Sequence, residues 1–327
     1  MRVYEYALKT GITRTKEFER KRLATHAVNV GTKCGHGCTY CSTGAMLRMH
    51  SSFRSLGLNP FGNGYAIVDP TTPERVARDA RRIQERGTVQ LCTTVDAWAP
   101  EAQEHGLGRR CLEAILSEPM WNVRILTKNA AVVHDYDLIK RHRDRVLVGL
   151  SITATPDKND VLTAVEPNAS PIAQRMAALG EAHARGLRTY AMLCPILPGI
   201  ADAPEQVDSL VKLAVACGAE EIFTEPINAR GPGLKATQDA LDSSGFRTEA
   251  AAIAQIRRKR NWSSYVVSLV ENIQRSVRAR ADITKLRILL YPSGLAPEDE
   301  ARIRQDDAGV IWLGKDPAST KANHAQD

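Results

Sequence analysis

The sequence predicts an α/β protein in which parallel β-strands alternate with helices around one large core. Short apolar, β-rich runs alternate along the chain with segments that carry apolar residues at helical spacing. The 327 residues are 43% hydrophobic and 25% charged, a globular composition long enough for one large domain and an appendage. This composition argues against a transmembrane, collagenous or disordered chain.

Six β-rich runs are expected to form the parallel sheet. Their apolar character is continuous, which suits strands that are buried on both faces. Strand–helix alternation implies right-handed parallel crossovers, a condition that a twisted open sheet and a barrel both satisfy. Periodicity alone does not separate these two architectures. The runs are Ala27–Val30, Val89–Thr94, Val123–Thr127, Val146–Ser151, Arg188–Ile196 and Glu221–Glu225.

Three helices predicted between these strands share the same start and stop signals. Each opens with a hydroxyl or carboxylate residue close to a Pro, so that a side chain caps free amide donors and the Pro loses no hydrogen bond. Each ends at a Gly, which readily takes the left-handed conformation that closes a helix. The three helices are expected to run from Thr72 to Gly87, from Ser170 to Gly186 and from Asp202 to Gly218.

The pattern changes after about residue 231, where a loop rich in Asp, Ser and Gly is expected to continue to Gly245. One long basic amphipathic helix is predicted over about 247–280. A strand at Arg287–Tyr291, a short helix near 297–305 and a strand at Val310–Leu313 follow. We therefore divide the chain into a basic N-terminal segment (1–24), a core (25–244) and a C-terminal extension (245–327).

Positive charge is concentrated in two segments of the chain. The net charge is +7, yet residues 1–54 and residues 247–287 each contain ten Lys and Arg against three Asp and Glu. Two basic segments on an acidic body could bind a polyanion such as nucleic acid, although solvated helix faces explain the same charges. The charged N-terminus lacks the apolar core of a signal peptide, and no apolar run is long enough to span a membrane. We expect a cytoplasmic protein without a membrane partner.

Three of the seven cysteines fall within eight residues, as Cys34-Gly-His-Gly-Cys38-Thr-Tyr-Cys41. Three thiolates at this spacing can cap three irons of a [4Fe–4S] cluster, and the glycines let the backbone wrap closely around it. One iron then stays open to a small molecule. The alternative is structural zinc with His36 or His50 as the fourth ligand, but zinc sites usually pair CxxC with a distant ligand pair that this sequence lacks.

This CxxxCxxC motif resembles the signature of the radical S-adenosylmethionine (SAM) superfamily. The resemblance implies a partial (β/α)6 TIM-type barrel with the cluster loop after the first strand. It also implies that SAM binds the open iron and is cleaved, after reduction by an electron donor, to methionine and a 5′-deoxyadenosyl radical. The protein then positions the chemistry that the cofactor carries.

Residues 25–230 are similar in more detail to the spore photoproduct lyase and DNA-repair-photolyase-like branch of that superfamily. The similar segments occur in the same order, at predicted strand ends. They are Asp96-Ala-Trp98-Ala-Pro100 with Gly108-Arg109-Arg110, Ile125-Leu-Thr127-Lys128-Asn129, Val148-Gly-Leu-Ser151-Ile152, Val165-Glu166-Pro167 with Pro171 and Arg175, and Pro195-Ile-Leu-Pro198-Gly199.

The resemblance assigns cofactor contacts to four residues. Tyr40 would stack near the adenine of SAM, Thr94 would lie near its amino group, and Lys128 and Ser151 would contact its carboxylate or ribose. These positions lie at the C-terminal ends of predicted strands, where barrel enzymes build their sites. A Lys that ends an apolar strand needs an anionic partner, which a ligand carboxylate or an internal salt bridge would supply.

Cys92 is the candidate catalytic residue. Spore photoproduct lyases use a second-strand cysteine to return a hydrogen atom to the substrate radical, and Cys92 lies on the equivalent predicted strand. Period-two alternation would place it on the same face as Thr94. The alternative is that Cys92 is an ordinary core residue.

The sequence departs from the branch at three places. Ser42 stands where the branch often has Tyr, Val28-Asn29-Val30-Gly31 replaces the usual Asn-Pro-Tyr, and Thr93-Thr94 replaces the superfamily's Gly-Gly-Glu. These differences concern the substrate and the quenching of its radical.

The leading hypothesis is a DNA repair reaction like that of spore photoproduct lyase. The alternatives are a radical SAM enzyme acting on a small metabolite, peptide or RNA, and a non-catalytic zinc protein that binds nucleic acid.

The long basic helix offers a candidate surface for nucleic acid. Arg257 and Arg275 are eighteen residues apart, as are Arg260 and Arg278, so each pair would share an azimuth on a straight helix. The resulting stripe would be about 27 Å long and could follow several phosphates.

Overall fold

A computed structural model describes residues 1–228 and 231–314 of the chain. The main sheet has nine strands in the order β12-β11-β10-β9-β8-β7-β6-β3-β2. All neighbouring pairs are parallel except β2 with β3. The strands are β2 (Thr13–Arg14), β3 (His26–Val28), β6 (Thr88–Leu91), β7 (Asn122–Thr127), β8 (Val146–Ser151), β9 (Arg188–Ile196), β10 (Ile222–Pro226), β11 (Leu286–Leu290) and β12 (Val310–Trp312).

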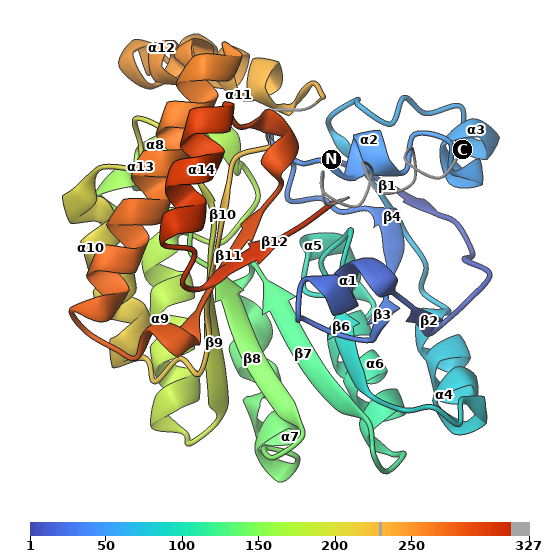
Figure 1. Cartoon of the computed structure of the whole chain (residues 1–327). Coiled ribbons are helices and arrows are strands. Elements are labelled where there is room, and N and C mark those ends of the chain that lie inside the picture. The colour runs from blue at the N-terminus through green and yellow to red at the C-terminus, as the bar shows by residue number, and fades with distance from the viewer. Residues whose placement is uncertain (229–230, 315–327) are drawn as a thin grey trace, which may run out of the picture.

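The predicted α/β class and the partial barrel are confirmed. The six β-rich runs correspond to β3 and to β6 through β10, and β11 and β12 extend the same sheet. The sheet curves, as Figure 1 shows, but its edge strands β2 and β12 do not pair with each other, so the barrel stays incomplete.

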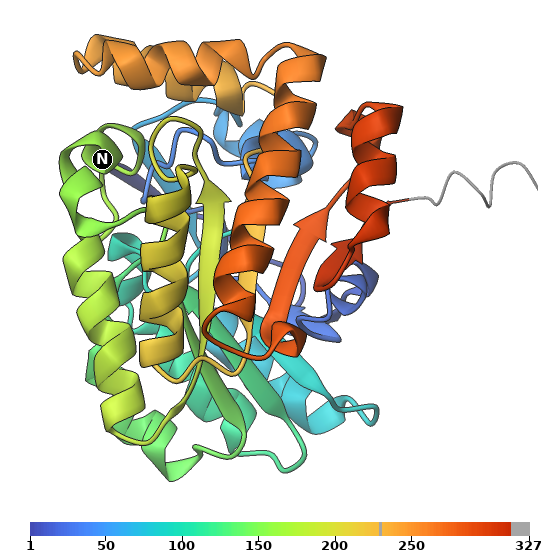
Figure 2. The ribbon, with the colours of Figure 1, turned by 60° about the vertical axis from the view of Figure 1, so that its left-hand side comes forward.

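The two faces of the sheet are packed differently. Helices α4 (Thr72–Arg82), α6 (Leu107–Leu116), α7 (Tyr136–Arg141), α9 (Ile172–Ala184) and α10 (Pro204–Ala216) cover one face, as part of the helical layer in Figure 2. Strand β8 is buried along its whole length, because alternate side chains face the helices and the opposite side. That opposite side, the interior of the partial barrel, is filled by a separate cluster that includes Tyr190, Met192, Phe223 and Leu289.

The helix boundaries agree with the sequence signals only in part. Gly186 and Gly218 follow α9 and α10 with φ of 72° and 67°, the left-handed conformation expected of a closing Gly. Helix α4 ends at Arg82, before the expected Gly87. The side-chain N-caps expected for these three helices are absent, because Thr71 makes no capping bond and Pro171 and Ala203 occupy the other two cap positions.

A second, three-stranded sheet was not predicted from the sequence. It has the order β1-β5-β4, with β1 (Arg2–Glu5) parallel and β4 (Gly31–Lys33) antiparallel to β5 (Tyr65–Val68). Strand β4 follows β3 after two residues, so this sheet supports the start of the cysteine loop. Between β4 and β5 lie the short helices α2 (Thr43–Met46) and α3 (Ser51–Leu56).

The C-terminal part corrects two expectations. The segment expected to be a loop forms helix α11 (Gly233–Ser243), and the single long basic helix is two helices, α12 (Arg247–Gln255) and α13 (Lys259–Arg278). Arg257 lies in the break, so the pairing of Arg257 with Arg275 on one straight helix is wrong. Arg260 and Arg278 do share α13. Helix α14 (Pro297–Gln305) lies between β11 and β12, as predicted.

The remaining elements are short, and several of them connect strands to the larger helices. They are α1 (Lys16–Arg20), α5 (Pro100–Glu104), α8 (Asn159–Val165) and the 3-10 turns η1 (Ala130–Asp135), η2 (Pro156–Lys158), η3 (Ile283–Lys285) and η4 (Pro292–Gly294). Within residues 1–228 and 231–314, no helix combines the length and apolar character needed to cross a membrane.

The close packing of the barrel interior gives a stability test. A Cβ at Gly149 of β8 would overlap the Tyr190 ring, so Gly149→Ala should lower the free energy of unfolding by about 1–3 kcal/mol through overpacking. Gly180→Ala in α9 is the control, because its Cβ would lie 3.9 Å from Cys217 Sγ and Ala favours a helix. Denaturant unfolding measures both, and equal stability of the two variants would contradict the packing described here.

Candidate active site

The three clustered cysteines lie in the loop between β4 and α2. All three line one cavity of about 130 Å³, together with Thr94. Neighbouring segments hold the loop backbone in place: Thr39 N donates to Val165 O at 2.9 Å, and Gly35 N donates to Glu101 Oε1 at 2.9 Å. The loop therefore has a defined shape in the protein alone.

The electrostatics of the three thiols suit a cationic cluster. Burial raises the pKa of Cys34 well above its ordinary value, and the charges of Cys41 and Cys38 raise it further. Burial, and then the charge of Glu166, raise the pKa of Cys38 to about 12. Three thiolates this close repel one another, and metal ions that bind thiolates would remove that cost. The residues present thus fit an iron–sulfur cluster.

The geometry does not favour the zinc alternative. Both ring nitrogens of His36 are engaged, Nδ1 with Asn168 O at 3.1 Å and Nε2 with Asp96 Oδ2 at 2.8 Å. His50 Nδ1 lies 2.9 Å from Ser52 Oγ. In the described part of the chain, no group of three or more His, Cys, Asp or Glu residues is arranged to hold a single metal ion.

Asp96 joins the cysteine loop to the end of β7. This buried carboxylate accepts hydrogen bonds from His36, from Trp98 N at 2.8 Å, from Thr127 Oγ1 at 2.9 Å and from Lys128 N at 2.9 Å. Burial acts to raise the pKa of Asp96, but the charge and hydrogen bond of His36, together with the hydrogen bonds from the backbone of Lys128 and Trp98, outweigh burial and lower it. Asp96 is therefore held as a carboxylate that orients His36 within the loop.

Glu166 is a second buried carboxylate beneath the loop. Its oxygens accept hydrogen bonds from Arg175 at 2.5 Å, from Thr153 Oγ1 at 2.9 Å and from the hydroxyl of Tyr40, and they lie 3.2 Å from Lys128 Nζ. Burial acts to raise the pKa of Glu166, but the charges of Lys128 and Arg175 outweigh it and lower the pKa to about 2.

Three of the predicted cofactor residues meet around this carboxylate. Lys128 Nζ donates to Ser151 Oγ at 2.6 Å and lies 5.6 Å from the centre of the Tyr40 ring. Lys128 thus has an internal anionic partner, Glu166, which was the alternative to a ligand carboxylate. Because Glu166 supplies this counter-charge, Lys128 by itself does not indicate that an anionic ligand binds here.

Thr94, the fourth predicted cofactor residue, is held in position by Asn29, the residue that follows β3. Asn29 Oδ1 accepts hydrogen bonds from the backbone N–H groups of Thr93 and Thr94, each at 2.9 Å. These bonds hold the turn after β6 so that Thr94 lines the cysteine cavity.

The structure places Cys92 away from this cavity. Cys92 is 4% exposed and belongs to the core cluster between the sheet and the helices, and it does not line the cysteine cavity. Cys194, at the end of β9, packs instead against the cluster inside the barrel. Its thiol donates to Glu225 Oε2 at 3.6 Å, and Ser151 Oγ donates to its carbonyl oxygen at 2.9 Å.

Sequence reasoning missed the roles of Glu166, Asp96 and Asn29. Glu166 and Asp96 stand within the segments that resemble the superfamily branch, so a signal was present. Asn29 stands in the segment Val28–Gly31, which departs from the sequence of the branch, so the resemblance gives no signal for its role. The contacts that join these residues to the rest of the site do not follow from local pattern, because they link residues more than 30 positions apart in the sequence.

The Glu166 cluster gives a pH-dependent stability test. Glu166→Gln should lower the free energy of unfolding by about 3 kcal/mol at neutral pH, because it leaves Arg175 and Lys128 without their buried counter-charge. A lowered pKa means that the carboxylate stabilises the fold above pH 4.5, the ordinary value, and that this contribution is lost as pH falls towards about 2. The difference between wild type and variant should shrink over that range.

Denaturant unfolding at several pH values measures this difference. Glu85→Gln is the control, because Glu85 and its partner Arg14 are both exposed and such pairs contribute little. A pH-independent difference for Glu166→Gln would contradict the proposed charge state of Glu166.

Part of this chain is similar in sequence to known proteins. A profile of the Radical SAM superfamily matches residues 28–213. An uncharacterized protein of the Acidianus two-tailed virus is 24% identical over 221 residues, which are 66% of this chain and 71% of the relative. An uncharacterized protein of Mycobacterium tuberculosis is 25% identical over 210 residues, 63% of this chain and 59% of that protein. This chain thus spans less than two thirds of the mycobacterial relative.

Solved structures show the same fold. Spore photoproduct lyase complexed with dinucleoside spore photoproduct has a TM-score of 0.58 at 15% identity, covering 85% of this chain and 79% of that one. A cysteine-to-serine variant of spore photoproduct lyase has a TM-score of 0.60 at 16% identity, with the same coverage. The profile match spans more than half of the chain, and the family's cofactors are a [4Fe–4S] cluster and SAM. The chain therefore belongs to the radical SAM superfamily and is a radical SAM enzyme.

Proposed function

We propose that Cys34, Cys38 and Cys41 hold the [4Fe–4S] cluster, and that the enzyme removes a hydrogen atom from a nucleotide of DNA in a repair reaction like that of spore photoproduct lyase. The observation that carries the proposal is the meeting of three free thiols in one cavity, in the loop that follows β3 and β4. When bound, the cluster and SAM supply a 5′-deoxyadenosyl radical, which attacks unreactive C–H bonds.

The residues around the cluster loop position the cofactor in this proposal. Tyr40, whose hydroxyl donates to Glu166, would provide a flat wall for the adenine of SAM, and Thr94 would offer its hydroxyl to the amino group. Lys128 and Ser151 lie next to each other and would contact the carboxylate or ribose, Lys128 as a donor and Ser151, whose hydroxyl proton goes to Cys194 O, as an acceptor. Because Glu166 already neutralises one charge, Lys128 would share its hydrogen-bond donors between Glu166 and the ligand.

The choice of DNA rests on two supports. The first is the similarity in fold to spore photoproduct lyase, a protein solved with a dinucleoside lesion. The second is the concentration of positive charge in residues 1–54 and 247–287. A radical SAM enzyme that modifies a small metabolite, a peptide or RNA is the alternative, and either version needs an electron donor to reduce the cluster. We also propose that residues 25–244 form the catalytic core and that 245–327 is an extension completing it.

Isotope tracing tests the proposed reaction. The enzyme, prepared without oxygen and reduced, is incubated with SAM and candidate substrates that carry deuterium at their C–H bonds. Deuterium should enter 5′-deoxyadenosine from an oligodeoxynucleotide that contains a thymine-dimer-type lesion. Transfer from a peptide, RNA or metabolite, with none from DNA, would refute the DNA repair proposal in favour of the alternative.

Replacing the clustered cysteines tests the cluster assignment. Cys34→Ala, Cys38→Ala and Cys41→Ala should each abolish SAM cleavage and lower the iron and sulfide content, because each removes one of three ligands. Cys217→Ala is the control, since Cys217 is buried at the end of α10 away from the loop. Full reductive cleavage of SAM by the Cys38→Ala protein would overturn the assignment.

A second pair of variants tests which thiol returns a hydrogen atom to the substrate. The resemblance assigns this role to Cys92, whereas the position of Cys194 on the inner side of the sheet favours Cys194. We expect that Cys194→Ala still forms 5′-deoxyadenosine but yields an altered product, and that Cys92→Ala yields the normal product. Mass spectrometry of the products measures this, and the reverse pattern would assign the role to Cys92.

A further inference from the structure

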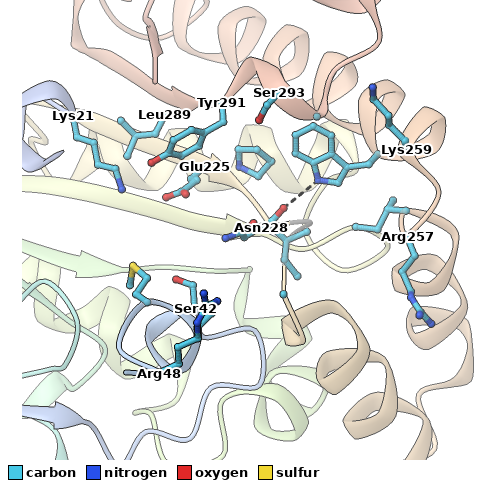
Figure 3. Close-up of a pocket in the computed structure, with 18 residues that line it drawn as sticks. Lys21, Ser42, Arg48, Glu225, Asn228, Arg257, Lys259, Leu289, Tyr291 and Ser293 are labelled. Atoms are coloured by element: carbon cyan, nitrogen blue, oxygen red, sulfur yellow. Dashed lines mark hydrogen bonds between the residues drawn. The ribbon is translucent and has the colours of Figure 1, made fainter. Parts of the chain in front are cut away.

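A second and larger cavity lies at the C-terminal ends of β10 and β11. Its volume is about 690 Å³, within the range of small-molecule sites. Figure 3 shows Ser42 and Arg48 across the cavity from Glu225 and Tyr291, with Arg257 and Lys259 at its other end.

This cavity adjoins the cysteine loop. Ser42, the residue after Cys41, lines the larger cavity together with part of α2, and the rest of α2 lines the cysteine cavity. Helix α2 and the turn at 231–233 thus form a wall shared by both cavities. A molecule bound in the larger cavity would lie directly beside the loop that we propose to hold the cluster.

Most of the lining lies outside the part of the chain that the family profile matches. The profile ends at residue 213, whereas Glu225, Arg257, Lys259 and Tyr291 lie beyond it. The break between α12 and α13 places Arg257 and Lys259 at the edge of the cavity. Figures 1 and 2 show α11 and α12 crossing over the ends of the strands. The C-terminal segments of this chain therefore shape the cavity.

The charges around the cavity are unbalanced. Among its described lining residues, Lys21, Arg48, Arg257 and Lys259 are cationic and only Glu225 is acidic. No ion pair joins Arg48, Arg257 or Lys259 to any residue in the described ranges, and within those ranges the Arg257 guanidinium donates only to the neutral Gln238, at 3.3 Å.

One acidic residue, Glu225, faces this positive charge. Burial raises the pKa of Glu225 above its ordinary value, against the opposite effect of the Lys21 charge. Two arginines at the other end of α13 differ from those at the cavity, because Arg278 pairs with Asp306 at 2.7 Å and Arg280 with Asp208 at 2.6 Å. Among residues 1–228 and 231–314, positive charge without an ion-pair partner is thus found at and just before the cavity end of this helix.

We propose that this cavity binds a nucleoside phosphate, free or as one unit of a nucleic-acid strand, with Arg48, Arg257 and Lys259 contacting the phosphate groups. Guanidinium and ammonium groups form their strongest hydrogen bonds with such anionic oxygens. The apolar wall of Ile227, Leu289 and Trp262 suits the body of a nucleoside. This inference rests on the proposed function, because it places the reacting nucleotide beside the cluster loop.

Binding measurements on the reduced, cluster-loaded enzyme test the site. The probe is a short fluorescein-labelled single-stranded oligodeoxynucleotide, followed by anisotropy between about 50 and 200 mM salt. The double variant Arg257→Gln/Lys259→Gln and the single variant Arg48→Gln should each weaken binding, the double variant by about tenfold or more, and should flatten the salt dependence. The control is Arg278→Gln/Arg280→Gln, which removes the same charge from the same helical region but should bind like wild type.

Competition with thymidine 5′-monophosphate separates the two sources of the ligand. If the mononucleotide displaces the strand and binds by itself, the free nucleotide is the ligand. If the mononucleotide does not displace the strand, the ligand is a nucleotide unit of the strand. Wild-type affinity in the double variant, with circular dichroism and iron content unchanged, would overturn the site. Equal loss in the control variant would overturn it as well, because binding would then follow overall charge.

The outcomes distinguish this inference from the proposed function. If the wild-type enzyme transfers deuterium from DNA but the variants at the cavity bind normally, the site is wrong and the repair reaction stands. If the wild type binds neither the strand nor the mononucleotide at low salt, both the site and the DNA substrate are wrong. The cluster assignment is then still decided by the cysteine variants.

Discussion

The site depends on one buried carboxylate, Glu166, whose negative charge is needed by residues from three different segments. It accepts hydrogen bonds from Tyr40 in the cysteine loop and from Arg175 in α9, and it pairs with Lys128 at the end of β7. Arg175 is 1% exposed, so its guanidinium would be a costly buried charge without this partner. The loop, the strand end and the helix therefore keep their relative positions only together.

Asp96 acts in the same way on the opposite side of the loop. It orients His36 through its side chain and accepts a hydrogen bond from the backbone of Lys128, whose side chain pairs with Glu166, so both carboxylates contact the same strand end. Between them they fix both ends of a loop whose three thiols repel one another when ionised. A loop held in this way can present three ligands to a cluster without first having to fold around it.

The C-terminal segments contact this arrangement and line the larger cavity beside it. Strands β11 and β12 continue the parallel sheet beyond the six strands of the barrel, and α11 and α12 cross over its end. Thr237 of α11 bonds to Thr39 of the cysteine loop at 2.9 Å, so the same segments that form the larger cavity also contact the loop. A change in the C-terminal segments would therefore alter the larger cavity and the cluster loop together.

The sequence by itself determined the six barrel strands and their order along the chain, the α/β class and the cysteine motif, because each depends on residues close together in the chain. Helix α11 escaped prediction, since the Gly and Asp residues within it resemble loop signals that tertiary packing overrides. Tertiary structure alone decided that Lys128 pairs with Glu166, that Cys194 rather than Cys92 lies on the inner side of the sheet, and that Arg257 lies at a break between helices. Each of these depends on which face of an element is buried and against what, and long-range packing sets that choice.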